Sequence, residues 1–290
     1  MGLDGGVNES PFTDLGRPPL NEQALNRMLV RSGSLWRRIE VVAETGSTNA
    51  DLAEAARRDA PEGQVLVAEA QTAGRGRLGR SWTAPPRSGL MFSVLLRPRV
   101  DPAALGWLPL LTGLATATAL RRVTGRAASG DFGRPGGSGL DVRLKWPNDL
   151  LVGERKLAGI LAEKVADAVV VGVGLNVSLR TDELPVPTAT SLACEDATFQ
   201  EREALLRAVL RELETWYREW TALKGDPETS GLRTAYKDLC ATLGRRVRVL
   251  LPGDRTLTGE AVDIDAAGCL VVATPEGDQV VGAGDVVHVR

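Results

Sequence analysis

The sequence has very little histidine and cysteine, and it has no strong excess of charge of either sign. His288 is the one histidine in 290 residues, which argues against a Ser-His-Asp triad or a multi-histidine metal site. The three cysteines, Cys194, Cys240 and Cys269, are far apart and form no C-x-x-C pair. This spacing indicates neither a zinc ribbon nor a disulfide framework, and it favours a reducing, cytoplasmic location.

Charge and hydropathy exclude further classes of protein. The 35 basic and 37 acidic residues give a net charge of -2, so there is no global electrostatic reason to bind nucleic acid or an anionic membrane. No apolar run is expected to reach the ~20 residues of a membrane span, and no secretory signal is evident. With 43% hydrophobic and 25% charged residues, the chain is typical of a globular protein.

Hydrophobic periodicity predicts a mixed α+β protein whose sheet is antiparallel or mixed. Residues 1–19 are expected to form a loose tail, and the six glycines of residues 125–139 indicate a surface insertion. After Leu243 the pattern changes to short alternating segments, which predict a small closed β-barrel. The expected organisation is a tail with a short helix (1–35), a catalytic domain (36–240) and a C-terminal barrel (241–290). Helices are expected at 21–30, 49–58, 102–123, 199–223 and 228–239, and strands at 37–43, 64–70, 90–96, 142–146, 150–152, 156–164 and 168–176.

The segment QTAGRGRLGR, residues 71–80, lies between two expected strands and alternates arginine with glycine. It contains G-x-G-x-x-G, but a proline-rich stretch and a strand follow instead of a helix, which argues against a dinucleotide fold. Glycine lets backbone N–H groups approach an anion, and Arg75, Arg77 and Arg80 supply guanidinium groups for a carboxylate or phosphate. We therefore predict an anion-binding loop, with a solvated surface turn as the alternative.

Two of only five lysines lie in the segment LKWPNDLLVGERKLAGILAE, residues 144–163. A hairpin turn at 153–154 is expected to bring the ammonium groups of Lys145 and Lys156 to one site. Fixed cations are the main catalytic requirement of adenylyl transfer, because negative charge spreads over the α-phosphate and the leaving pyrophosphate. A surface lysine at a hairpin end, and a structural turn at Trp146 and Pro147, are the alternatives.

Two further segments carry polar groups at the ends of expected elements. Ser47, Thr48 and Asn49 precede a helix and are expected to cap it, although the same hydroxyls can also bind a small polar ligand. Asn176 ends the strand VVGVGLN, where its amide either bonds to a loop or contacts a ligand.

Taken together, STN, QTAGRGRLGRSW, KWPND with RKLAGIL, and GVGLNV resemble, in order and spacing, the biotin protein ligase family. The match covers roughly residues 36–180, and the C-terminal barrel resembles the small SH3-like domain that ends these enzymes. The resemblance implies a catalytic domain similar to the class II aminoacyl-tRNA synthetase sheet. It also implies ATP and biotin as substrates, Mg²⁺, and a biotin carboxyl carrier protein as partner, in a monomer or weak homodimer.

The resemblance assigns roles residue by residue. It implies that Lys156, Arg77 and Lys145 are catalytic, and that Asp149 is a candidate for contact with Mg²⁺. The biotin site would comprise Ser47, Thr48, Asn49, Gln71, Gly74, Arg75, Gly76, Arg77, Lys156 and Gly159. The ATP and adenylate site would comprise Arg77, Arg80, Trp82, Lys145, Asn148, Asp149 and Asn176.

Some members of this family carry an N-terminal helix-turn-helix that represses transcription. Only about 35 residues precede the first expected strand here, so we expect a ligase without repressor function and without a nucleic-acid or membrane partner. A lipoate ligase of the same fold class and a binding module that uses the arginine loop are the rival interpretations. The glycine-rich segment 125–139 departs from the family pattern but lies outside every matched motif.

Overall fold

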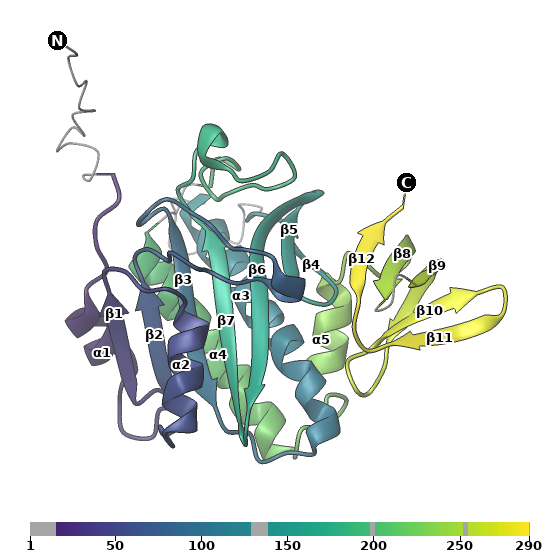
Figure 1. Cartoon of the computed structure of the whole chain (residues 1–290), viewed down its shortest axis with the longest axis horizontal. Coiled ribbons are helices and arrows are strands. Elements are labelled where there is room, and N and C mark those ends of the chain that lie inside the picture. Colours follow the sequence, from purple (N-terminus) through teal and green to yellow (C-terminus); the bar gives the residue numbers. More distant parts are fainter. Residues whose placement is uncertain (1–15, 129–138, 198–200, 252–254, 290) are drawn as a thin grey trace, which may run out of the picture.

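The computed structural model describes residues 16–128, 139–197, 201–251 and 255–289. The sequence predictions for the beginning of the tail and for most of the 125–139 insertion lie outside these residues. The described chain forms a seven-stranded sheet flanked by helices and a separate five-stranded sheet at the C-terminus (Figure 1). The mixed α+β architecture predicted from the sequence is therefore confirmed.

The large sheet has the spatial order β1-β2-β3-β7-β6-β5-β4. Strands β1 and β2 are parallel and every other neighbouring pair is antiparallel, so the sheet is mixed. Every residue of the interior strand β3 is buried, which explains a sequence in which Ser93 is the one polar side chain. The strands are β1 (Arg38–Val42), β2 (Gln64–Ala68), β3 (Gly89–Leu96), β4 (Val142–Lys145), β5 (Asp149–Val152), β6 (Arg155–Val165) and β7 (Ala168–Asn176).

Helices cover both faces of this sheet (Figure 1). Helix α2 packs on one face, over a small cluster that includes Leu52, Leu66 and Leu95. Helices α3 and α4 pack against each other and against the opposite face, above the main core. The α-helices are α1 (Glu22–Leu29), α2 (Thr48–Arg57), α3 (Trp107–Ala128), α4 (Arg202–Ala222) and α5 (Leu232–Leu239), with short 3-10 turns η1 (Arg77–Gly79), η2 (Pro102–Gly106) and η3 (Thr181–Glu183).

The segment from Pro102 to Gly125 is long and apolar enough to span a membrane, with a mean hydropathy of 1.5 over an 18-residue window. The expectation that no such segment occurs is therefore wrong. In the fold, 67% of this window is buried, because α3 lies between α4 and strands β4, β5 and β6. Burial inside the protein accounts for its apolar composition.

The described part of the N-terminal segment is anchored, whereas the sequence predicted a loose tail. Arg17 Nη2 lies 2.5 Å from Glu183 Oε2 and donates to the Ser178 carbonyl. A second anchor lies at Leu20, whose backbone N–H donates to the buried carboxylate of Glu69. The same carboxylate pairs with Arg202 at 2.5 Å. Buried charges require such partners, and composition alone does not reveal them.

Helix α1 protects the edge strand β1. The Asn26 side chain donates to the Ile39 carbonyl at 2.6 Å and accepts from the Ile39 N–H at 3.1 Å. The amide thus satisfies the backbone groups that an exposed sheet edge would offer to another chain.

The C-terminal sheet is antiparallel, with the order β11-β10-β9-β8-β12. Its end strands β11 and β12 pair with β10 and β8 but not with each other within the described residues, so hydrogen bonding there does not close the barrel that the sequence predicted. Trp107 Nε1 and Trp146 Nε1 of the larger domain donate to the carbonyls of Ala266 and Gly268 and hold the two parts together. The strands are β8 (Arg246–Leu251), β9 (Arg255–Ile264), β10 (Leu270–Thr274), β11 (Gly277–Val281) and β12 (Asp285–His288).

Candidate functional site

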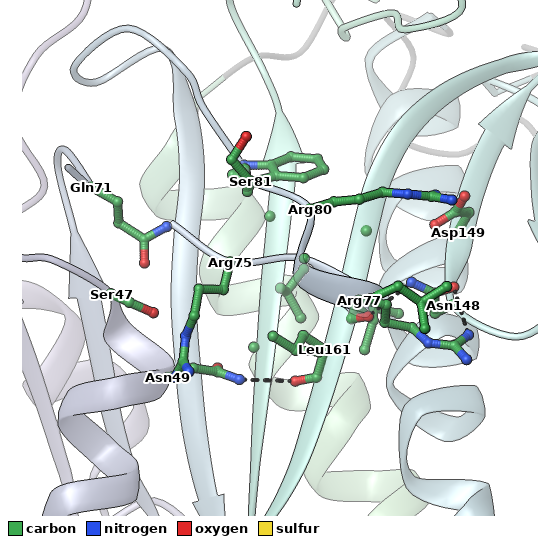
Figure 2. A pocket seen from close by; sticks show the side chains of 18 of the residues that line it. Ser47, Asn49, Gln71, Arg75, Arg77, Arg80, Ser81, Asn148, Asp149 and Leu161 are labelled. Atoms are coloured by element: carbon green, nitrogen blue, oxygen red, sulfur yellow. Dashed lines mark hydrogen bonds between the residues drawn. The ribbon is translucent and has the colours of Figure 1, made fainter. Parts of the chain in front are cut away.

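A cavity of about 800 Å³, its mouth included, lies on the α2 side of the large sheet. Strands β6 and β7, the start of α2, the loop 74–82 and the start of β12 surround it, as Figure 2 shows in part. The sequence-predicted residues that line it are Ser47, Thr48, Asn49, Gln71, Arg75, Gly76, Arg77, Arg80, Trp82, Asn148, Asp149, Lys156 and Gly159.

Neutral hydrogen-bonding groups gather at the start of α2. Gln71 Oε1 accepts from the backbone N–H of Thr48 at 2.8 Å and lies 3.1 Å from Thr48 Oγ1. Ser47 occupies the N-cap position of α2, but its side chain makes no capping hydrogen bond, so the predicted capping role is wrong. Its hydroxyl belongs to the cavity wall beside Gln71 (Figure 2).

The cavity floor is made by glycines on adjacent strands. Gly159 of β6 and Gly174 of β7 are register partners, and the Trp82 indole packs against both. A Cβ atom at Gly174 would overlap the indole, and one at Gly159 would lie 3.2 Å from Trp82 Cζ3. Glycine at these positions therefore lets the flat Trp82 indole lie directly on the sheet.

Charged groups gather at the other end of the cavity. Lys156 Nζ lies 2.7 Å from Asp149 Oδ1 and 5.8 Å from the centroid of the Trp82 ring. An irregularity in the β5–β6 register, between Leu150 and Leu151, accompanies this placement, because a bulge redirects the side chains beyond it.

The loop 74–82 folds back on itself over the cavity. Gly76 N donates to the Arg80 carbonyl at 2.7 Å, and Leu78 and Gly79 have φ values of 56° and 73° in the turn η1. Such values are strained for leucine and suit glycine. The loop therefore brings its three arginines to the cavity lining, with the Arg75 and Arg80 side chains still 47% and 60% exposed to solvent.

Arg77 is the most deeply placed arginine of the loop and donates to Asn148 Oδ1 at 3.2 Å. Burial lowers the pKa of Arg77, whereas the carboxylates of Asp285 and Asp149 act in the opposite direction. Asn148 is itself held because its Nδ2 donates to the Ile160 carbonyl. The guanidinium group therefore faces the charged end of the cavity from a fixed support.

The C-terminal sheet contributes a carboxylate that the sequence did not suggest. Asp285 pairs with Arg80, and this hydrogen bond raises the pKa of Arg80. No local pattern connects Asp285 to a loop about 200 residues earlier. The lining residues missed in the sequence are Leu78, Ser81, Phe92, Ile160, Leu161, Gly172, Val173, Gly174, Gly284 and Asp285.

Three predicted site residues do not line the cavity. Lys145 ends the edge strand β4, two strands away from β6, so the hairpin does not bring it beside Lys156. It instead acts on His288, whose pKa is lowered first by burial and then by the positive charge of Lys145. Asn176 Nδ2 donates to the Thr190 carbonyl, which is the loop-bond alternative. Gly74 lies against the Trp82 carbonyl, where a Cβ would overlap it, and so serves the loop's own pairing.

The described residues contain no group of three or more histidine, cysteine, aspartate or glutamate side chains placed to hold a metal ion. Asp149 and Asp285 are the carboxylates of the cavity lining, and each is paired with a cation. This donor set fits a Mg²⁺ ion held mainly by substrate phosphates and one or two carboxylates, not a metal caged by protein.

Comparisons with known proteins match both parts of the chain. Residues 41–178 match the biotin/lipoate A/B protein ligase family, and residues 242–289 match the biotin protein ligase C-terminal domain. The biotin–[acetyl-CoA-carboxylase] ligase of Mycobacterium tuberculosis is 44% identical, over 94% of this chain and 97% of its own. The bifunctional ligase/repressor BirA of Bacillus spizizenii is 30% identical, over 85% of this chain and 72% of its own. The structure of the Aquifex aeolicus biotin protein ligase with biotin and ATP superposes with a TM-score of 0.70 at 30% identity, covering 88% of this chain and all (100%) of that one.

Proposed function

The chain belongs to the biotin/lipoate A/B protein ligase family, as a biotin protein ligase, and we propose that it acts in two half-reactions. In the first, the biotin carboxylate attacks the α-phosphate of ATP, which forms biotinyl-5′-AMP and releases pyrophosphate. In the second, the amine of a lysine on a biotin carboxyl carrier protein attacks the acyl carbon of this mixed anhydride and releases AMP.

The observation that carries this proposal is the unlike chemistry of the two ends of the cavity. Hydroxyl and amide groups of Ser47, Thr48 and Gln71 suit the neutral ureido ring of biotin, which needs paired donors and acceptors. Lys156 and Arg77 at the other end suit the biotin carboxylate and the phosphates. One elongated ligand with a neutral ring and an anionic end matches both.

Lys156 is the residue to which we assign the chemical step. A biotin carboxylate is already ionised at neutral pH, so attack on phosphorus requires no general base. Charge that moves toward the pyrophosphate needs a fixed cation, and Lys156 is held beside the glycine floor for that role. Asp149 sets the position of the ammonium group and is displaced in part when the anions bind.

The loop 74–82 is assigned two tasks. Its arginines neutralise the carboxylate and phosphates, and its closure excludes water from a hydrolysable acyl adenylate. Arg75, on the same loop, already reaches the β6 side of the cavity, with Nη2 lying 3.4 Å from Glu163 Oε2. Mg²⁺, when bound with ATP, would neutralise the triphosphate, with Asp149 as the residue that we expect to face it.

Lipoate ligation is the rival reaction within the same family. The dithiolane ring of lipoate offers no N–H or carbonyl group, so it would cover the cavity-lining polar groups of Ser47 and Gln71 without giving them a ligand partner. Unpaired buried polar groups are costly, and this cost favours biotin over lipoate.

Operator binding and membrane attachment are not part of the proposal. Between Gly16 and β1 the described residues contain one helix, α1, whose Asn26 and Glu22 side chains bond to strand β1. These contacts hold α1 against the sheet edge, so the helix is used to cover β1. We propose a cytoplasmic enzyme, a monomer or weak homodimer, whose macromolecular partner is the carrier protein.

Transfer to a carrier domain tests the whole proposal. The protein is incubated with biotin, ATP, Mg²⁺ and a biotin carboxyl carrier domain, and the intact mass of the carrier is measured. We expect a gain of one biotinyl group on a single lysine, with one AMP released per transfer. A carrier that keeps its mass, while a known biotin protein ligase modifies it, would overturn the assignment.

A further inference from the structure

A buried chain of hydrogen bonds runs beneath the neutral end of the cavity and includes two residues that the assignment above does not use. Ser93 lies on β3, and Glu163 lies on β6. Ser93 is fully buried, and Thr48 and Asn49 are each 4% exposed. The members of this buried polar chain, in order, are Gln71, Thr48, Ser93, Asn49 and Glu163.

The side-chain amide of Asn49 is fully used inside the protein. Asn49 Nδ2 donates to the Leu161 carbonyl at 3.2 Å, as Figure 2 shows, and to Glu163 Oε2 at 2.7 Å. Asn49 Oδ1 accepts from Ser93 Oγ at 2.6 Å. Oδ1 also lies against Gly172 of β7, where a Cβ atom would overlap it. Asn49 therefore has no N–H group left for a ligand, and its Oδ1 is bound to Ser93 beneath the cavity.

The direction in which the Ser93 hydroxyl donates its proton limits the direction in which the Thr48 hydroxyl can donate. Asn49 Oδ1 carries no proton, so the Ser93 hydroxyl must donate its own to that contact. Thr48 Oγ1, 2.7 Å from Ser93 Oγ and 3.1 Å from Gln71 Oε1, then donates its one proton to one of these two oxygens. In either case Thr48 presents only lone pairs to the cavity.

We propose that Ser93 is a positioning residue that sets the hydrogen-bond polarity of the ring pocket, so that Thr48 Oγ1 accepts from an N–H of the ligand ring. This inference rests on the proposed function, because the biotin ureido ring has two such N–H groups. It also changes the expected role of Asn49, whose side chain fixes the start of α2 instead of forming a hydrogen bond with the ligand. Glu163 contributes to this polarity because it accepts from Asn49 Nδ2 and so keeps Asn49 Oδ1 directed toward Ser93.

The test compares biotin with two cyclic carbamate analogues, in each of which one ring N–H is replaced by oxygen. Biotin-dependent pyrophosphate exchange gives kcat/KM for each acid. A ring oxygen placed against the Thr48 lone pairs loses a hydrogen bond and adds a repulsion. The wild type is expected to disfavour one of the two analogues by about 100-fold or more.

In Ser93→Ala the Thr48 hydroxyl loses the 2.7 Å contact to Ser93 Oγ and keeps only the longer, 3.1 Å contact to Gln71 Oε1, so its proton can turn toward the ligand more readily. We expect the preference for biotin over that analogue to shrink at least tenfold. A ratio measured within one preparation is insensitive to the fraction of folded enzyme. Ser88→Ala is the matched control, because Ser88 is equally buried and donates to the Pro85 carbonyl outside this chain of bonds.

A double-mutant cycle separates this role from a merely structural one. Thr48→Val removes the acceptor and is expected to reduce the same preference, and adding Ser93→Ala should reduce it no further. Ser93→Cys, which preserves size and donates weakly, should fall between Ser93→Ala and the wild type, and it serves as the second variant if Ser93→Ala does not fold.

The outcomes distinguish the inference from the function. A wild-type protein that shows no biotin-dependent exchange overturns both. A wild type that is active, together with a Ser93→Ala variant whose preference stays within twofold of the wild-type value, overturns the inference and leaves the proposed function standing.

Discussion

Lys156 Nζ and Asp149 Oδ1 lie 2.7 Å apart at the charged end of the cavity, with the lysine side chain 34% exposed and the aspartate side chain 19% exposed. A partly exposed ion pair of this kind contributes little to stability. The ion pair matters for position instead, because the Asp149 carboxylate holds the flexible Lys156 side chain beside Gly159 on the cavity floor. Substrate anions can then take over a cation that is already in place, which reduces the reorganisation needed for reaction.

Replacement of Lys156 by alanine is expected to lower the rate of adenylation about 100-fold or more, because loss of one charged contact to the transition state costs a few kcal/mol. Pyrophosphate exchange at saturating biotin and ATP measures this rate. Lys164→Ala is the control, since Lys164 lies on the same strand but is exposed and does not line the cavity. Equal turnover of the two folded variants would contradict the catalytic assignment.

Replacement of Asp285 by asparagine is expected to raise the KM for ATP about three- to tenfold, with a much smaller change in the KM for biotin. Asp285 orients Arg80 from the C-terminal sheet, and the neutral amide holds the guanidinium group less firmly. Steady-state kinetics with each substrate varied in turn check the difference. Asp278→Asn, on the exposed strand β11, should leave both constants unchanged; a similar rise there would point to a general effect on the sheet.

Replacement of Arg202 by alanine is expected to destabilise the protein by about 3–5 kcal/mol, because the carboxylate of Glu69 would remain buried without its cation. Denaturant unfolding measures the change in the free energy of unfolding. A Glu69→Gln, Arg202→Met double variant should recover part of this loss, since no charge stays buried. A loss below 1 kcal/mol in Arg202→Ala would show that the pair is not isolated from water.

His288 is expected to make the protein less stable in acid. Burial, aided by the positive charges of Lys145 and Arg245, lowers the pKa of His288 from 6.5 to about 4, against the opposing effect of Glu154. The unfolded chain therefore takes up a proton first, and stability that is complete above pH 6.5 is lost as the pH falls toward 4. His288→Gln should flatten this part of the Tm profile. Parallel Tm profiles of the two proteins between pH 6.5 and 5 would contradict the prediction.

Replacement of Arg77 by glycine is expected to leave the fold intact and to release biotinyl-5′-AMP from the cavity. The loop would lose its contact with Asn148 and the charge that retains the adenylate. Free acyl adenylate reacts with any accessible amine, so bystander proteins in the mixture should acquire biotin. Labelling that remains confined to the carrier lysine would argue against retention by the loop.

Much of the large sheet could be predicted, because its strands and helices have local signals. Strand β3 is a run of apolar residues interrupted by Ser93, and the hairpin at Gly153 follows a turn pattern with φ of 57°. Most site residues could also be predicted, because Ser47, Gln71, Arg77 and Lys156 belong to short segments that match a family pattern in order.

The remaining site residues have no local signal. Ser93 and Gly172 are parts of apolar strands, and only the β3–β7 register places them side by side beneath Asn49. Asp285 reaches the loop because the two domains pack through Trp107 and Trp146, a contact between distant segments. Lys145 is absent from the cavity lining for the same reason, since strand order, and not sequence distance, decides which lysine reaches the cavity.

Exchange of labelled pyrophosphate into ATP with Mg²⁺ tests the central claim most directly, because it isolates adenylate formation and needs no carrier protein. The account predicts exchange with biotin and none with lipoate or without an added acid. Exchange with lipoate alone would move the chain to the lipoate branch of its family. Exchange with neither acid, in folded protein, would contradict the assignment of the cavity to acid activation.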